Sequence, residues 1–182
     1  MSDYNCIIGI DPGANGGVAV YTDNHISVVR MPKDLNDLRR LLEYYRENYN
    51  PIVFVEKINV RPDDVRLPDG SPNMGKIFRI QALIRNHEGL KAMIGVTNIP
   101  YALVHPLTWQ SRLNLRKTGE QKNERKKRYK DVATSMFPSV KVTMWNCDAL
   151  LIMQFGRWAV AEFRWLKKNI VNLPNATLFN NN

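Results

Sequence analysis

The chain has 182 residues, 44% hydrophobic and 24% charged, a composition ordinary for one globular domain with a full core. Lysine and arginine outnumber aspartate and glutamate by 26 to 17, which gives a net charge of +9. So positive a chain favours a polyanionic partner, nucleic acid ahead of an anionic membrane surface. No apolar run approaches the ~20 residues of a membrane span. The polar N-terminus lacks the basic region of a secretion signal, and Cys6 and Cys147 lack metal-ligand spacing, so we expect a cytoplasmic protein with two buried free thiols.

Three short apolar runs open the chain at residues 6–11, 17–22 and 25–30 and predict an antiparallel meander. The first run ends in Asp11, and a glycine-rich turn follows it. A carboxylate at the end of a buried strand is costly unless something compensates it, and a bound cation is the usual solution. The glycines allow positive φ and the close approach of a ligand. Alternatively, Asp11 only caps the turn, because Asp-Pro-Gly is common turn chemistry.

The next segments alternate between helix and strand. Residues 35–48 carry leucines at helical spacing after Asp34, a suitable N-cap, and predict an amphipathic helix. The apolar run 52–55 is typical of a central strand and ends in Glu56, as the first strand ends in Asp11. Residues 57–74 are polar and have no period, so we expect a long loop, a kind of segment that is often functional. A helix from 75 to about 90 and a short strand at 102–104 follow.

Basic residues concentrate between 111 and 130, where the acids are Glu120 and Glu124. A solvated helix face is one interpretation of such a run. Because the basic residues flank a Thr-Gly turn in a strongly cationic chain, we favour binding to a phosphate backbone. The basic residues of this segment are Arg112, Arg116, Lys117, Lys122, Arg125, Lys126, Lys127, Arg128 and Lys130.

The last long apolar stretch predicts a helix from Asn146, its expected N-cap, to about residue 168. Asp148 lies in the first turn of that helix, where the helix dipole favours a negative charge. We expect residues 1–173 to form one domain and residues 174–182 to be a disordered tail.

Three acids thus stand at the ends of elements: Asp11, Glu56 and Asp148. If the first strand and the strand at 52–55 are neighbours, Asp11 and Glu56 emerge side by side and repel each other unless a cation lies between them. Mg²⁺ and Mn²⁺ prefer such oxygen ligands and also bind phosphates. A two-metal site of this kind hydrolyses phosphodiesters by in-line displacement.

The order of elements and acids resembles the ribonuclease H-like fold and, more narrowly, the RuvC-type Holliday-junction resolvases of bacteria and their phages. That resemblance implies an α/β fold with a mixed five-stranded sheet, an antiparallel meander plus parallel strands, flanked by helices. The matching pieces, in the family's order, are Gly9-Ile10-Asp11-Pro12-Gly13, Val53-Phe54-Val55-Glu56, Gly75-Lys76-Ile77-Phe78, Val104-His105-Pro106-Leu107-Thr108-Trp109 and Asp148-Ala149-Leu150-Leu151-Ile152 through Phe155-Gly156.

The resemblance also implies an activity. A homodimer would bind four-way DNA and nick two opposing strands, leaving 5′-phosphate and 3′-hydroxyl ends. Asp11, Glu56 and Asp148 would hold Mg²⁺ or Mn²⁺. The basic segment is expected to continue as a helix to Phe137-Pro138, the third along the chain, and a lysine near its start, Lys122 or Lys126, would join the site. Lys76 is expected among the DNA-binding residues.

The helix at 75–90 is the expected centre of the dimer interface, with Ile77, Phe78 and Ile84 as contacts. The alternative is that these residues are ordinary core. Phe78 or Met74 would alternatively wedge between unstacked bases at the crossover, as apolar side chains do in other DNA-bending proteins.

The sequence departs from the family at one place. The family usually carries a further acid three or four residues before the Asp148 position, where this chain has Trp145 and Met144. A water, the scissile phosphate or the Asn146 amide would replace that acid, and Asp131 is another candidate. The alternative functions are a junction-binding protein with weak or no cleavage and another ribonuclease H-like nuclease acting on flaps or hybrids. A sugar or acetate kinase lobe is disfavoured by length and by positive charge.

Overall fold

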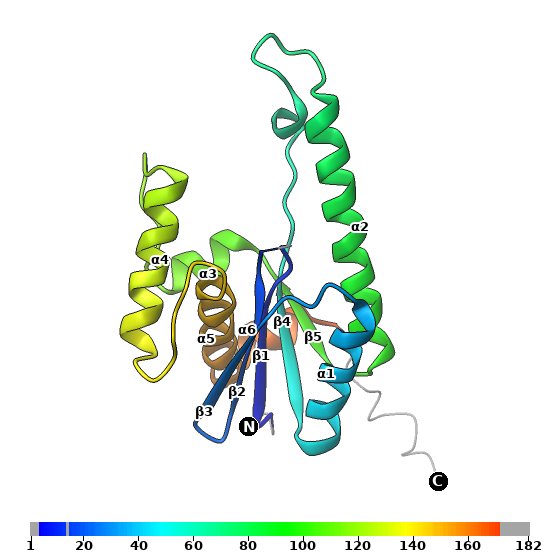
Figure 1. The fold of residues 1–182 in the computed structure, drawn as a ribbon. Coiled ribbons are helices and arrows are strands. Elements are labelled where there is room, and N and C mark those ends of the chain that lie inside the picture. Colours follow the sequence, from blue (N-terminus) through cyan, green and yellow to red (C-terminus); the bar gives the residue numbers. More distant parts are fainter. Residues whose placement is uncertain (1–3, 14, 172–182) are drawn as a thin grey trace.

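The computed structural model describes residues 4–13 and 15–171, so the expected tail at 174–182 lies outside the described residues. A mixed six-stranded sheet in the order β3-β2-β1-β4-β5-β6 forms the centre, with helices on both faces (Figure 1). The strands β1, β2 and β3 form the expected antiparallel meander, and β1, β4 and β5 are parallel. The strands are β1 Cys6–Asp11, β2 Gly17–Thr22, β3 His25–Arg30, β4 Pro51–Glu56, β5 Tyr101–Val104 and β6 Ile170–Val171.

The predicted mixed α/β fold is confirmed, and its predicted count of five strands is one too low. The additional strand, β6, has two residues and pairs antiparallel with β5. So short a strand carries no alternating pattern. It is stabilised by its pairing with β5 and by the packing of Ile170 against the core.

Alternating side chains of the strands build one apolar core on each face of the sheet. Ile7 of β1 points to the face covered by α4 (Lys122–Met136) and α5 (Cys147–Ala161). Ile8 and Ile10 point to the opposite face, where α1 (Leu35–Asn48) and the end of α2 (Met74–Val96) pack. Nine residues of α5 are buried, so this helix is the largest single contribution to the first core.

Several predicted element boundaries are wrong. Helix α2 continues to Val96, with Gly89 and Gly95 inside it, because packing of its last turns outweighs the ~1 kcal/mol that a helical glycine costs. The expected loop at 57–74 contains the 3₁₀ helix η1 (Pro62–Val65) and a β-bridge between Arg66 and Pro72. Helix α3 (Pro106–Arg112) was not predicted, although Pro106 at its first position is a helix-start signal.

The long helix predicted for 146–168 is two helices. Helix α5 ends at Ala161, and Phe163 takes a φ of 20°, which a continuous helix does not allow. The chain then forms α6 (Arg164–Asn169), which leads into β6. The break returns the chain to the edge of the sheet beside β5.

Helix α2 belongs to the core at one end and projects from the body at the other. Its later turns bury Leu90 and Ile94 against α1 and the sheet. Its first turns and the connection from β4 run beyond the edge of the sheet at which β1 and β4 end (Figure 1). We call residues 57–86 the arm. Met74, Phe78 and Ile84 are exposed on it at 56%, 62% and 43%, so the interpretation of Phe78 and Ile84 as ordinary core is wrong.

Cys6 and Cys147 are both buried and free, as expected. Burial raises the pKa of both thiols to about 12. Within the described part of the chain, no helix combines the length and the apolar character needed to cross a membrane.

Candidate active site

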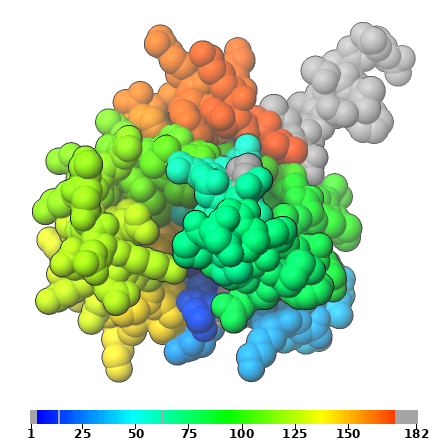
Figure 2. All heavy atoms as spheres, turned by 90° about the horizontal axis from the view of Figure 1, so that it is seen from above, coloured from blue at the N-terminus to red at the C-terminus, as the bar shows by residue number. Residues whose placement is uncertain are grey.

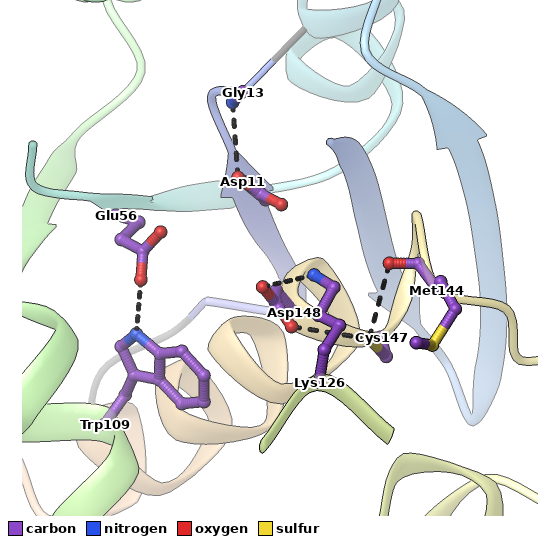
Figure 3. A network of polar contacts seen from close by, with 8 residues as sticks. All are labelled: Asp11, Gly13, Glu56, Trp109, Lys126, Met144, Cys147 and Asp148. Atoms are coloured by element: carbon purple, nitrogen blue, oxygen red, sulfur yellow. Dashed lines mark hydrogen bonds and ion pairs between the residues drawn. The ribbon is translucent and has the colours of Figure 1, made fainter. Parts of the chain in front are cut away.

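Asp11 and Glu56 end two neighbouring parallel strands. In the ladder between β1 and β4, Ile10 lies opposite Val55, so Asp11 and Glu56 occupy the next positions along the two strands. Asp148 comes from the first turn of α5, which packs across β1. The three carboxylates therefore lie together at one edge of the sheet, each delivered by a different element (Figure 3).

A close contact between β1 and α5 brings Asp148 to Asp11. A Cβ atom on Gly9 would lie 2.5 Å from the Ala149 carbonyl oxygen and 2.7 Å from the Met153 Cα. Such distances are far below van der Waals contact, so any larger residue would separate strand and helix. Glycine at position 9 is thus required for the placement of the two acids.

The glycines after Asp11 do not act as expected. Among the described glycines, positive φ occurs at Gly70 and Gly119 only, so left-handed backbone is the wrong explanation for those in this turn. Gly16 is needed because a Cβ atom there would lie 2.8 Å from the Asp11 carboxyl carbon. Asp11 Oδ1 also accepts the Gly13 N–H at 3.2 Å, so this acid caps the turn as well as facing the other acids.

Burial and mutual repulsion disfavour ionisation of two of the acids. Burial raises the pKa of Asp11, and the nearby Asp148 carboxylate raises it further. Burial, followed by repulsion from Asp11 and Asp148, raises the pKa of Glu56 to about 8. A neighbouring cation would reverse both effects.

Lys126 already supplies one positive charge to this group. Its Nζ lies 2.6 Å from Asp148 Oδ2 (Figure 3). Burial works against the charged ammonium, but the Asp148 carboxylate outweighs it and raises the pKa of Lys126. Of the two lysines suggested by the sequence, Lys126 contacts the acids, whereas Lys122 lies one turn earlier on α4 with an exposed side chain.

Trp109 and His87, for which the sequence predicts no role, hold Glu56 in place. The indole Nε1–H of Trp109 donates to Glu56 Oε1 at 3.0 Å, and His87 Nε2 donates to the Glu56 carbonyl oxygen at 3.2 Å. Both side chains are buried, and burial lowers the pKa of His87. The sequence offered one signal for Trp109: the N–H of a buried indole usually needs a hydrogen-bond acceptor.

Trp145 and Met144 stand at the positions where the family usually carries a further acid. Trp145 lies against Gly17, where a Cβ atom would be 2.9 Å from its ring, and the Arg30 guanidinium stacks on it at 5.1 Å. Met144 is 46% exposed at the mouth of the cleft described below. Asp131 is exposed on α4 and is not among the described residues that line that cleft.

Asn146 is the N-cap residue of α5, as expected, but its side chain bonds to the preceding loop rather than to the first turn of the helix. Its Oδ1 accepts the Thr143 N–H at 2.7 Å, and its Nδ2 donates to the Lys141 carbonyl at 3.1 Å. The expected capping hydrogen bond is absent from this described residue. Because both polar atoms already have partners and the side chain is 1% exposed, Asn146 is a poor replacement for the missing acid.

A cleft of about 690 Å³ opens beside the acids. Seen from above, it lies between the arm and α4 (Figure 2). Glu56 and Asp148 line it, and Asp11 lies next to them. The remaining lining residues are Asn59, Arg61, Asp64, His105, Pro106, Leu107, Trp109, Gln110, Lys122, Asn123, Arg125, Lys126, Tyr129 and Met144.

The basic residues of the sequence divide into those at the cleft and those away from it. Lys122, Arg125 and Lys126 line the cleft. The guanidinium of Arg112 instead stacks on Trp158 at 4.1 Å, and Arg128 is paired with Glu120. Arg116, Lys117 and Lys127 are exposed but do not line the cleft, and Lys76 is exposed on the arm.

The donor chemistry of the site fits a hard divalent cation. Three carboxylates meet in a half-buried setting where two of them have raised pKa values, and carboxylate oxygens are the ligands that Mg²⁺ and Mn²⁺ prefer. In the described residues, no group of three or more aspartate, glutamate, histidine or cysteine side chains is arranged to hold a metal ion. Asp148 is instead held by Lys126.

No protein-family model matches the sequence, and no curated protein matches it. Two solved structures of RuvC from Thermus thermophilus are similar to it. The RuvC in complex with a Holliday junction substrate has a TM-score of 0.53 at 14% identity, covering 88% of this chain and 96% of that chain. The other RuvC structure has a TM-score of 0.52 at 16% identity, covering 87% and 96%. This chain therefore has the fold of the RuvC Holliday-junction resolvases, the ribonuclease H-like fold that the order of its motifs predicts.

Proposed function

We propose that this protein is a structure-selective DNA endonuclease of bacterial or phage-infected cells that resolves four-way junctions by paired nicks. The reaction depends on Mg²⁺, with Mn²⁺ as the substitute, and leaves 5′-phosphate and 3′-hydroxyl ends. The observation that carries the proposal is the meeting of Asp11, Glu56 and Asp148 with Lys126 at one edge of a sheet with the RuvC fold.

Each charged residue has a definite task in this scheme. Asp11, Glu56 and Asp148 would hold the cation, which would supply activation of the attacking water and stabilisation of the leaving 3′ oxygen. Lys126 pairs with Asp148 at 2.6 Å and would add a positive charge beside the scissile phosphate.

The surroundings of the acids suit branched DNA. Lys122, Arg125 and Arg61 line the same cleft, and the chain carries a net charge of +9, so phosphates are attracted to both walls. The arm and α4 flank the cleft (Figure 2). One of the duplexes of a four-way junction would lie between them. The similar RuvC structure from Thermus thermophilus is a complex with a Holliday junction substrate, which supports the same substrate class here.

Paired nicking needs two sites, and the arm offers a surface for a second copy. Phe78 and Ile84 are exposed there, and Ile77 is half-buried beside them. Aromatic side chains dominate many interfaces, so Phe78→Asp should give a monomer that makes single nicks. A wild-type mass of one chain at micromolar concentration, measured by light scattering, would refute paired nicking.

The decisive experiment compares nicking of a synthetic four-way junction, a linear duplex and a flap in Mg²⁺. Asp11→Asn should abolish nicking of the junction, and Lys126→Gln should reduce it at least tenfold. Lys167→Gln is the control, because Lys167 is an exposed lysine of α6 that does not line the cleft, and this variant should nick at nearly the wild-type rate. Undiminished nicking by Asp11→Asn would refute the assigned site.

The second candidate function is junction binding with weak or no cleavage. The packing of Trp145 on Gly17, where the family usually has an acid, favours it. Tight junction binding without Mg²⁺-dependent nicks by the wild-type protein would establish it. Preferential cutting of the flap or of an RNA–DNA hybrid would instead identify another kind of ribonuclease H-like nuclease.

A further inference from the structure

The Glu56 carboxylate receives one hydrogen bond from the described residues, and Trp109 donates it at 3.0 Å. Trp109 is 1% exposed, and its ring packs edge-on against Tyr129 with the ring centres 5.4 Å apart. Its helix, α3, is fixed at its start, where His105 Nδ1 accepts the Leu107 N–H at 3.2 Å. The indole is therefore a rigid donor aimed at a single oxygen of Glu56.

The second oxygen of Glu56 is directed away from the indole (Figure 3). A carboxylate at the end of a glutamate side chain rotates easily, because its terminal torsion has a broad profile. Fixing one oxygen by a buried donor fixes the plane of the carboxylate. Oε2 is then the oxygen left to act as a ligand.

We propose that Trp109 is a positioning residue, which holds Glu56 by Oε1 so that Oε2 alone binds the divalent cation in the cleft. The inference rests on the proposed metal-dependent function and adds a residue to it. Residues that hydrogen-bond to metal ligands orient those ligands, and removing them typically lowers metal affinity 10- to 100-fold.

A purely structural role for the same hydrogen bond makes a different prediction. If Glu56 only satisfies the buried indole, loss of the N–H lowers stability and leaves metal affinity unchanged. Positioning instead predicts weaker metal binding in a protein that is still folded. It also predicts a lower kcat with an unchanged KM for the junction, because Trp109 contacts Glu56 rather than the basic walls of the cleft.

The chain offers a matched control for the test. Trp158 is packed at 5.3 Å from the ring of Phe155, and its buried Nε1 has no hydrogen-bond partner among the described residues. Trp109→Phe and Trp158→Phe therefore remove the same indole, but only the first removes a hydrogen bond. Mn²⁺ binding to the metal-free proteins is measured by electron paramagnetic resonance without DNA, and kcat and KM for junction nicking are measured beside it.

Trp109→Phe should bind Mn²⁺ about 10- to 100-fold more weakly than wild type and show reduced kcat with unchanged KM, whereas Trp158→Phe should match wild type. Equal Mn²⁺ affinity in the two folded variants would overturn the inference. If Trp109→Phe does not fold, NMR spectra of ¹⁵N-tryptophan-labelled wild type, recorded with and without Mg²⁺, test the inference instead. Mg²⁺ should shift the indole resonance that Glu56→Gln also shifts, and a resonance unmoved by Mg²⁺ would overturn the inference.

The proposed function and this inference fail in distinguishable ways. A wild-type protein that binds no Mn²⁺ overturns both. A wild-type protein that binds Mn²⁺ but nicks no junction refutes the nuclease, while weaker Mn²⁺ binding by Trp109→Phe still supports the positioning role.

Discussion

The stability of the metal-free protein should fall as pH rises through the titration of Glu56. Burial, then repulsion from Asp11 and Asp148, raises the pKa of this acid from 4.5 to about 8. An acid with a higher pKa in the folded chain binds its proton more tightly there than in the unfolded chain. The stabilising contribution is therefore complete below about pH 4.5 and is lost as pH rises through about 8.

The expected size of this effect follows from the difference between the two pKa values. At about 1.36 kcal/mol per pH unit, a rise from 4.5 to about 8 corresponds to about 5 kcal/mol between pH 4.5 and pH 9. That is a large part of the roughly 5–15 kcal/mol that stabilises an ordinary domain. Glu56→Gln stays neutral, so it should equal wild type near pH 4.5 and exceed it by about 5 kcal/mol near pH 9.

Urea unfolding followed by tryptophan fluorescence measures this difference. Wild type, Glu56→Gln and Glu47→Gln are freed of metal with a chelator and unfolded near pH 5 and near pH 9. Glu47 is an exposed acid of α1, so its variant should keep the wild-type pH dependence. Added Mg²⁺ should stabilise wild type near pH 9 and have much less effect on Glu56→Gln.

Parallel pH profiles for wild type and Glu56→Gln, within about 1 kcal/mol of each other, would refute the reasoning. They would mean that Glu56 ionises without cost. Its carboxylate would then be well solvated and remote from Asp11 and Asp148, and the acids would not form a cation site.

Other consequences of the structure are open to direct measurement. Gly9→Ala should lower the free energy of unfolding by about 3 kcal/mol and abolish nicking; wild-type stability in chemical denaturation would contradict the close contact of β1 with α5. Cys6 and Cys147 should react with a thiol reagent only as fast as the protein unfolds, because both are buried with pKa values of about 12; immediate reaction of the native protein would show that they are accessible. Replacing Lys122 and Arg125 by glutamine should lower the log–log salt dependence of DNA binding by about 2, since each phosphate contact contributes about 0.9; an unchanged slope would remove both residues from the DNA-binding surface.

Local signals were sufficient for the elements whose residues interact with near neighbours in the chain. The strands at 6–11, 17–22 and 25–30 were predicted with correct bounds, because short apolar runs separated by turn residues define each of them. The position of Asp34 as the cap of α1 is confirmed by its 2.8 Å hydrogen bond to Asn36. Boundaries failed where distant contacts decide, as at β6, which depends on β5 for its pairing.

The same division holds at the candidate site. Asp11, Glu56 and Asp148 were singled out because each stands at the end of an apolar element, which is a property of the local sequence. The partners of Glu56 were not found, since Trp109 lies 53 residues away from it along the chain. The choice between Lys122 and Lys126 also stayed open, because both lie on one face of α4, and only the packing of α4 on α5 decides which reaches Asp148.

The direct contact between the main chains of β1 and α5 at Gly9 determines which substitutions alter the site. Main-chain atoms of α5 approach the main chain of β1 with no side chain between them, so the gap between the carboxylates of Asp11 and Asp148 is a backbone dimension. Substitutions elsewhere in either apolar layer alter the filling of the interior but not that gap. A side chain at position 9 would therefore change the spacing of the two acids directly, by pushing the main chain of α5 away from β1.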